Sequence, residues 1–256
     1  MLVASMDHSP QEIPNDRDVW HTSALLVSVS AEQWDWDKVL GPLLNPQGKK
    51  LRKWAARRSD RYRNEFRRQF PGFLASSGVF ALALSVQGKT IIDSLPELIS
   101  QMDLGGNIHV SGEKTIISGL ASGRNFTLPT RQAASVVYIT HFICRMHALI
   151  LDRLREDDGN IVWCDWQISP DNFPLGIDGP MSTLFYIIAE NAAKIRLVSG
   201  NLRVSTHLSG DPGVDVCDNL AGMLRDDLTQ GMCTLKCFER PTMGGMYWEI
   251  HAVGNA

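Results

Sequence analysis

Residues 2–9, LVASMDHS, are the stretch from which the fold of this chain is worked out. The run begins with apolar and small residues that favour a strand, and its first carboxylate is Asp7, followed directly by His8 and Ser9. An aspartate that closes a strand is most often a turn residue, so a strand is predicted over Leu2–Asp7. Asp7 indicates a functional site only if acids from later in the chain lie beside it.

Length and composition favour one elaborated domain over residues 1–256. The chain is 44% hydrophobic, enough to bury a substantial core, and its formal net charge of −3 does not by itself indicate a nucleic-acid binder. No apolar run approaches the roughly 18 residues that cross a bilayer, and no signal-peptide pattern is present. The five cysteines are scattered, and CTLKC at 233–237 lacks a second Cys/His pair at zinc-ligand spacing. We therefore expect no membrane association and a reducing, cytoplasmic location.

The pattern that follows the first strand predicts a mixed sheet. Further strands are expected over 19–29, 79–86, 161–167, 202–208 and 246–253, and helices over 130–156, 181–195 and from Pro212 to near Gly231. Three early strands suit an antiparallel meander, and the later alternation of strand and helix suits parallel crossovers. This combination describes an α/β, RNase H-like fold with flanking helices, in which the first strand lies beside the fourth. A Rossmann-type fold is disfavoured because no glycine-rich turn follows the first strand.

Two segments are predicted insertions into this domain, a basic helical one at about 47–72 and a hairpin-containing one at about 88–130. The basic segment includes KKLRKWAARRSDRYRNEFRRQF, Lys49–Phe70, in which ten Lys or Arg stand against two acids before Pro71-Gly72 ends the helix. Such a charge run is usually a solvated surface. The functional alternative is a set of phosphate contacts by Lys49, Arg52, Arg57, Arg63 and Arg67.

Asp165 lies in VWCDWQ, between Trp163, Cys164 and Trp166. Aspartate is a poor strand residue, and the plain explanation is an acid that begins a loop at a strand end. If the first and fourth strands are parallel neighbours, about 4.8 Å apart, Asp7 and Asp165 both lie near carboxyl ends and can share one cation.

The helix that begins at Pro212 carries the third acid. Its apolar stripe has helical periodicity and contains Val214, Cys217, Ala221, Leu224 and Leu228. Asp218 falls within this stripe and is predicted to point toward the sheet, where an unpaired carboxylate costs several kcal/mol. Asp215 lies on the flank within reach of the same site, whereas Asp226 and Asp227 are predicted to be solvated.

Carboxylates crowded together in this way repel one another unless a divalent cation lies between them. Asp7, Asp165 and Asp218, with Asp215, offer the hard oxygen ligands that Mg²⁺ or Mn²⁺ requires, and such sites hydrolyse phosphodiesters. The competing explanation is three unrelated acids in a chain that contains 28 of them. His207 is a candidate proton shuttle at the end of its strand, whereas His141 is predicted to be a core residue.

Four motifs together resemble the bacterial domain-of-unknown-function family 3800: LVASMDHS, VWHTSALLVSV, IVWCDW and DPGVDVCDNLAG, in that order. The resemblance implies an RNase H-like, nuclease-type protein found near mobile elements and anti-phage systems, with Asp7, Asp165 and Asp218 at the positions of the family's acids. His8 stands where the family has Glu, and Asp215 where Gln is usual.

The resulting expectation is a nuclease that uses Mg²⁺ or Mn²⁺ on DNA or RNA, with a protein partner in a defence complex. The alternative is a catalytically inactive RNase H-like scaffold or partner subunit, which the replacement of Glu by His8 favours. The sequence leaves open the choice between DNA and RNA, and the oligomeric state.

Overall fold

The protein is described by a computed structural model. It describes residues 2–9, 19–29, 54, 60–101, 106–118, 125–134, 137, 138, 141, 163–168, 201–206, 212–232 and 245–251. Of the predicted elements, the helix over 181–195 and most of the helix over 130–156 lie outside these residues. No helix within the described part of the chain is long and apolar enough to cross a membrane.

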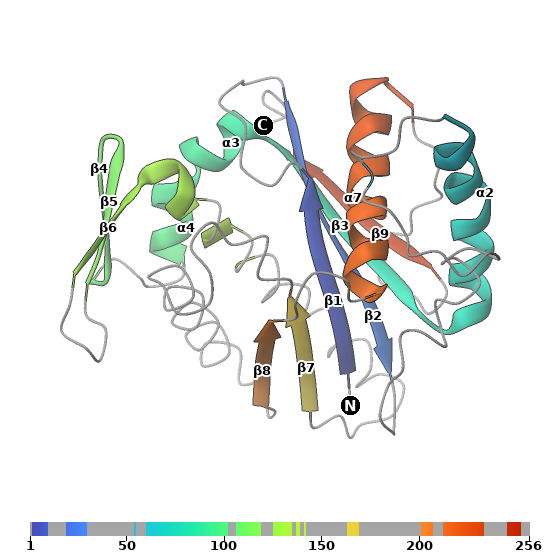
Figure 1. The fold of residues 1–256 in the computed structure, drawn as a ribbon. Helices are drawn as coiled ribbons and strands as arrows, with labels where there is room; N and C mark the ends of the chain where they lie inside the picture. The colour runs from blue at the N-terminus through green and yellow to red at the C-terminus, as the bar shows by residue number, and fades with distance from the viewer. Residues whose placement is uncertain are drawn as a thin grey trace.

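A mixed sheet of six strands, in the order β8-β7-β1-β2-β3-β9, forms the centre of the fold (Figure 1). Its strands are β1 (Leu2–Ser9), β2 (Trp20–Val29), β3 (Phe80–Gln87), β7 (Trp163–Ile168), β8 (Asn201–Thr206) and β9 (Met246–His251). The β1–β2 and β2–β3 pairs are antiparallel, whereas β1–β7, β7–β8 and β3–β9 are parallel. The predicted α/β class and mixed sheet are confirmed, and β9 lies at one edge.

Strand β1 is longer than the sequence predicts. It continues through His8 and Ser9, which pair with Ser23 and Thr22 of β2, so Asp7 lies inside the strand and does not close it. The reason is the partner strand: β2 extends far enough to hydrogen-bond the last residues of β1, and this pairing outweighs the turn preference of aspartate.

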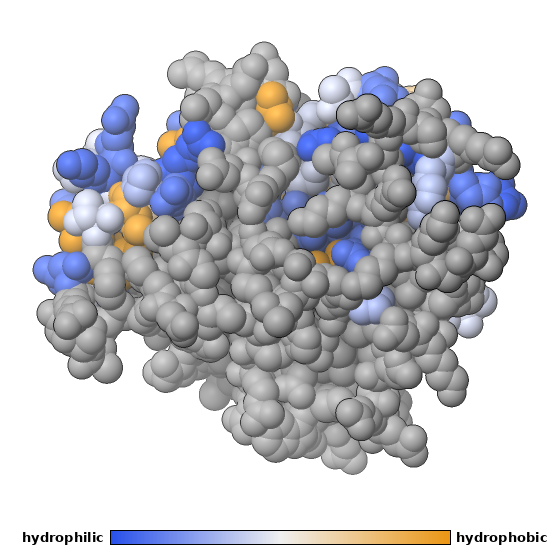
Figure 2. Space-filling model, in the orientation of Figure 1, coloured by the Kyte–Doolittle hydropathy of each residue, from blue (hydrophilic) through white to orange (hydrophobic). Residues whose placement is uncertain are grey.

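Two helices, α2 (Asp60–Ser77) and α7 (Pro212–Thr229), lie together on one side of the sheet (Figure 1). They enclose one apolar cluster with the sheet, to which α2 contributes Phe66, Phe70 and Phe73 and the sheet contributes Ala24 and Ala83. The stripe predicted on α7 is confirmed, because Cys217, Ala221 and Leu224 are fully buried. The outward face of α2 is hydrophilic, seen as blue surface at the right of Figure 2.

The prediction that Pro71-Gly72 ends the basic helix is wrong, because α2 runs through Pro71 to Ser77. Residues 71 and 72 are exposed, whereas Phe73 and Leu74 return to the core. A proline inside a helix costs about 3 kcal/mol. Burying two large apolar side chains stabilises by about 1.5–3 kcal/mol each, which is enough to offset that cost.

The other side of the sheet is covered by α3 (Gly88–Asp93) and α4 (Leu95–Gln101), beyond which lies a three-stranded sheet (Figure 1). That sheet contains β4 (Ile108–Ser111), β5 (Lys114–Ile117) and β6 (Phe126–Pro129), paired antiparallel in this order. The predicted hairpin is confirmed as β4–β5, and β6 is an additional strand. Thr130 ties this sheet to the helical residues that follow, since its hydroxyl bonds to Thr115 and donates to the Gly112 carbonyl at 2.9 Å.

Candidate metal centre

Strand β1 and helix α7 are joined by two hydrogen bonds that fix their relative position. The Cys217 thiol donates to the Ser5 carbonyl at 3.0 Å, and Arg225 Nη1 donates to Ser9 Oγ at 2.7 Å. Eight helix residues advance about 12 Å and four strand residues about 13 Å, so the two elements run in the same direction and remain in step. Asp7, midway between Ser5 and Ser9, therefore lies at the level of Ala221.

Asp7 faces α7. Side chains alternate along a strand, and Asp7 shares the parity of Ser9, whose hydroxyl is bonded to the helix. Asp7 is 5% exposed, and its Oδ1 accepts the backbone N–H of His8 at 2.6 Å. A carboxylate this deeply buried is maintained only by polar or cationic partners.

Asp218 lies one helical turn before Ala221, on the same helix that covers Asp7. It is half-buried, and its Oδ2 accepts the backbone N–H of Trp54 at 2.6 Å. The sequence did not suggest this partner, which comes from the basic segment 164 residues earlier. Asp215 is also half-buried and lies in the first turn of α7, where its carbonyl accepts Asn219 Nδ2 at 2.6 Å.

The structure does not bring Asp165 to the level of Asp7. In the parallel β1–β7 pair, Asp165 is in register with Val3, four residues before Asp7. At about 3.3 Å per residue along a strand and 4.8 Å between strands, the two Cα atoms are roughly 14 Å apart. Ligand oxygens lie about 2.0–2.6 Å from Mg²⁺ or a similar ion, so one ion does not join Asp7 and Asp165 in this register.

Residue 8 lies on the opposite face of the sheet. His8 and His21 are both buried, with ring centroids 5.3 Å apart. Burial, with additional repulsion from His8 and Arg225, holds the pKa of His21 well below 6.5. A glutamate at position 8 would also lie on this face, so its replacement by His8 does not change the donors that face α7.

A polar layer that the sequence did not predict connects α2 to α7. Arg67 Nη2 donates to Asp227 Oδ1 at 2.9 Å, and the Asp227 side chain is 0% exposed. Arg63 lies 3.5 Å from Asp226, which also accepts the Trp54 indole N–H at 2.7 Å. The prediction that Asp226 and Asp227 are solvated is therefore wrong. The helical spacing of Asp227 from the buried Leu220 and Leu224 was the signal that would have placed it inward.

The remaining predicted residues of the site, Lys49, Arg52, Arg57 and His207, lie outside the described residues. The two that are described, Arg63 and Arg67, are both paired with α7. Within the described residues, no group of three or more His, Cys, Asp or Glu is arranged to hold a metal ion. Of the predicted ligands, Asp7 lies on β1 and Asp218 on α7, the two elements that are joined at the β1–α7 contact.

Comparisons of this chain with protein-family models, with curated proteins and with solved structures find no match. The resemblance of the four sequence motifs to family 3800 therefore stays a prediction.

Proposed function

We propose that the protein is an RNase H-like, metal-dependent nuclease centred on Asp7 and Asp218. The observation that carries the proposal is the strand order β3-β2-β1-β7-β8, with β1 antiparallel to β2 and parallel to β7. This order is the one expected for an RNase H-like sheet. It puts a buried aspartate on the central strand, beneath a helix that carries a second one.

In this proposal the chain's own residues bind and orient. Asp7 is held by the β1 backbone, and Asp218 by the helix and by the Trp54 N–H, so both carboxylates are positioned before any ligand arrives. A bound Mg²⁺ or Mn²⁺ supplies an acidified water and charge neutralisation at the phosphate. Asp215, one turn before Asp218 on α7, is a further oxygen donor for such an ion.

Phosphate contacts in this proposal come from the basic segment that precedes α2. Lys49, Arg52 and Arg57 lie on either side of Trp54, whose backbone N–H reaches Asp218. Trp54 itself contacts the Asp218 carboxylate, and these cations are its near neighbours in the sequence. In this proposal the attraction between these cations and the nucleic-acid phosphates offsets the repulsion of those phosphates by the acidic centre.

A non-catalytic scaffold or partner subunit is the second candidate function. Two observations favour it: the register that separates Asp165 from Asp7, and the occupation of Asp218 Oδ2 by the Trp54 N–H. A protein partner in a defence complex belongs to this alternative and also to the first.

The test is cleavage of labelled DNA, RNA and hybrid substrates with Mg²⁺, Mn²⁺ or EDTA. Cleavage that needs the ion and is abolished by Asp7→Asn and by Asp218→Asn supports the nuclease. The exposed Asp93→Asn variant is the matched control and retains activity. If Asp165→Asn abolished cleavage as completely as Asp7→Asn, the β1–β7 register would have to differ from the one described. Absence of cleavage, together with no bound metal by mass spectrometry, supports the scaffold.

A further inference from the structure

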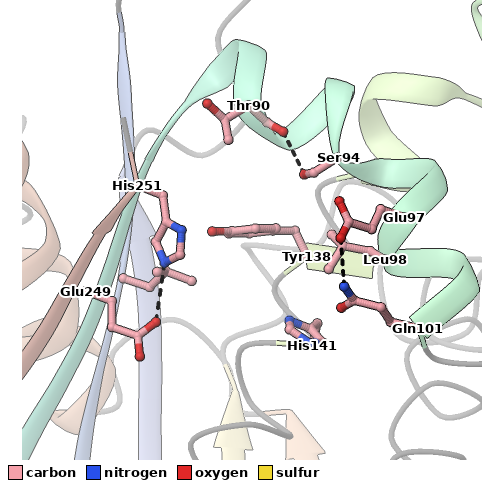
Figure 3. Close-up of a pocket in the computed structure, with 10 residues that line it drawn as sticks. Thr90, Ser94, Glu97, Leu98, Gln101, Tyr138, His141, Glu249 and His251 are labelled. Carbon is pink, nitrogen blue, oxygen red and sulfur yellow. Dashed lines mark hydrogen bonds and ion pairs between the residues drawn. The ribbon is translucent and has the colours of Figure 1, made fainter. Parts of the chain in front are cut away.

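A cavity of about 260 Å³ lies on the side of the sheet opposite α7 (Figure 3). Its floor includes Leu84 of β3 and Glu249 of β9, which are in register, and its other walls come from α3, α4 and the helical residues Tyr138 and His141. At roughly 30 Å³ per water molecule, it has room for about nine waters. A ligand of similar size has about nine non-hydrogen atoms.

Two carboxylates line the cavity from different elements. Glu97 comes from α4 and Glu249 from β9, and Figure 3 shows them on opposite sides of the Tyr138 ring. No Lys or Arg is among the described residues that line this space. Apart from the two imidazoles and the Tyr138 phenol, the ionisable groups among these described residues are the two carboxylates, which favour a cation over an anion.

Both carboxylates are oriented by neighbours. Glu249 has a side chain 11% exposed, accepts a hydrogen bond from the Tyr247 hydroxyl and lies 3.4 Å from His251 Nε2. Glu97 accepts Gln101 Nε2 at 3.0 Å, one turn along α4. Two anchored anions at the two ends of a small space, with an aromatic ring between them, match a ligand that is cationic at both ends and apolar in the middle.

We propose that this cavity binds a small aliphatic dication, with an amine or guanidinium group at each end. One end pairs with Glu97 and the other with Glu249, and the methylene chain lies against Tyr138 and Leu84. This site is separate from the β1–α7 contact, because the sheet lies between them. Its test therefore needs no nuclease activity, and failure of either proposal is recognised independently of the other.

The probe is 1,6-diaminohexane, compared by calorimetry at low salt with 1,6-hexanediol and with adipate, which match its length but are neutral and anionic. We expect the diamine to bind at least about tenfold more tightly than either, because only its charge complements the cavity. Glu97→Gln and Glu249→Gln should each weaken it by about three- to tenfold. Glu113→Gln, the same change at an exposed residue between β4 and β5, should leave the affinity at the wild-type value.

Three calorimetric results would overturn the proposal: no heat of binding for the diamine, equal affinity for the diol, or unchanged affinity in both Glu97→Gln and Glu249→Gln. Glu97 is exposed on α4, so Glu97→Gln keeps the fold, and circular dichroism checks this directly. Shifts of the His141 and His251 imidazole resonances on adding the diamine localise its binding to the cavity. Their absence, with shifts elsewhere, places the diamine at another surface and contradicts the assignment.

Discussion

The contact between Gly222 and Trp54 gives the most discriminating test of how α7 meets the basic segment. Gly222 is a buried residue inside α7, and an ideal Cβ built on it lies 2.3 Å from Trp54 Cδ1. Trp54 is itself 1% exposed and is fixed by two hydrogen bonds: its backbone N–H donates to Asp218 at 2.6 Å, and its indole N–H donates to Asp226 at 2.7 Å. Gly222→Ala therefore forces a bound tryptophan to move.

Two opposite effects decide the sign of the change in stability. In the interior of a helix, alanine is more stable than glycine by about 0.5–1 kcal/mol. Overfilling a core costs about 1–3 kcal/mol, and loosening the Trp54 hydrogen bonds adds about 1 kcal/mol for each bond lost. The expected net result is a loss of about 2 kcal/mol, which for a chain of this size lowers Tm by roughly 4–8 °C.

The assay is urea and thermal unfolding followed by circular dichroism, with Gly72→Ala as the matched control. Gly72 lies inside α2, and an added Cβ there meets nothing within 4 Å, so this variant should gain about 0.5–1 kcal/mol. In a Trp54→Leu background the penalty of Gly222→Ala should shrink or reverse, because the clashing ring is gone. If Gly222→Ala is stabilised like Gly72→Ala, Trp54 does not lie over α7 and the reasoning is refuted.

Three further outcomes are expected. Arg67→Ala leaves the fully buried Asp227 without its guanidinium partner and should lower the free energy of unfolding in urea by about 3–5 kcal/mol. Arg68→Ala, at an exposed residue, should keep the wild-type urea midpoint. Equal midpoints for the two variants would contradict the buried Arg67–Asp227 pair. Because the pKa of His21 is held well below 6.5, the native state keeps it neutral while the unfolded chain takes up a proton. The free energy of unfolding is therefore unaffected by His21 above about pH 7 and falls by up to about 1.4 kcal/mol per pH unit below 6.5. His21→Leu should remove this slope. An unchanged slope in that variant points to another group. Nucleic-acid binding is followed by fluorescence anisotropy as a function of salt. Replacing the cations on either side of Trp54 together should reduce the slope of log affinity against log salt concentration by about 2–3 units, whereas Arg63→Gln should change the stability of the protein and leave this slope unchanged. The reverse pattern would put the phosphate contacts on α2. The cations replaced together are Lys49, Arg52 and Arg57.

Local patterns predicted most of the described elements of the fold. The apolar stripe of α7 placed Cys217, Ala221 and Leu224 in the core, and Pro212 marked the start of that helix, as the structure confirms. The order of strands and helices was sufficient to predict a mixed sheet, because strand and helix periodicities differ and crossover lengths separate parallel from antiparallel pairs. These features depend on residues a few positions apart.

The details of the candidate site depend on residues far apart in the chain. Asp165 was correctly assigned to a strand, but its pairing with Val3 follows from how β7 slides against β1, which side-chain alternation does not specify. The helical spacing of Asp227 indicates an inward position, but its partner Arg67 is 160 residues away, on a helix whose position the local pattern does not give.

The amino-acid sequence alone therefore determined most of the described strands and helices and the apolar face of α7, since those are properties of short-range backbone geometry. Only the tertiary structure decided that α7, which carries Asp218, packs on β1, that Asp165 is in register with Val3 and not with Asp7, and that Arg67 pairs with Asp227. The physical reason is that register and helix placement are set by the summed burial of many side chains from distant parts of the chain, and no single segment contains that sum.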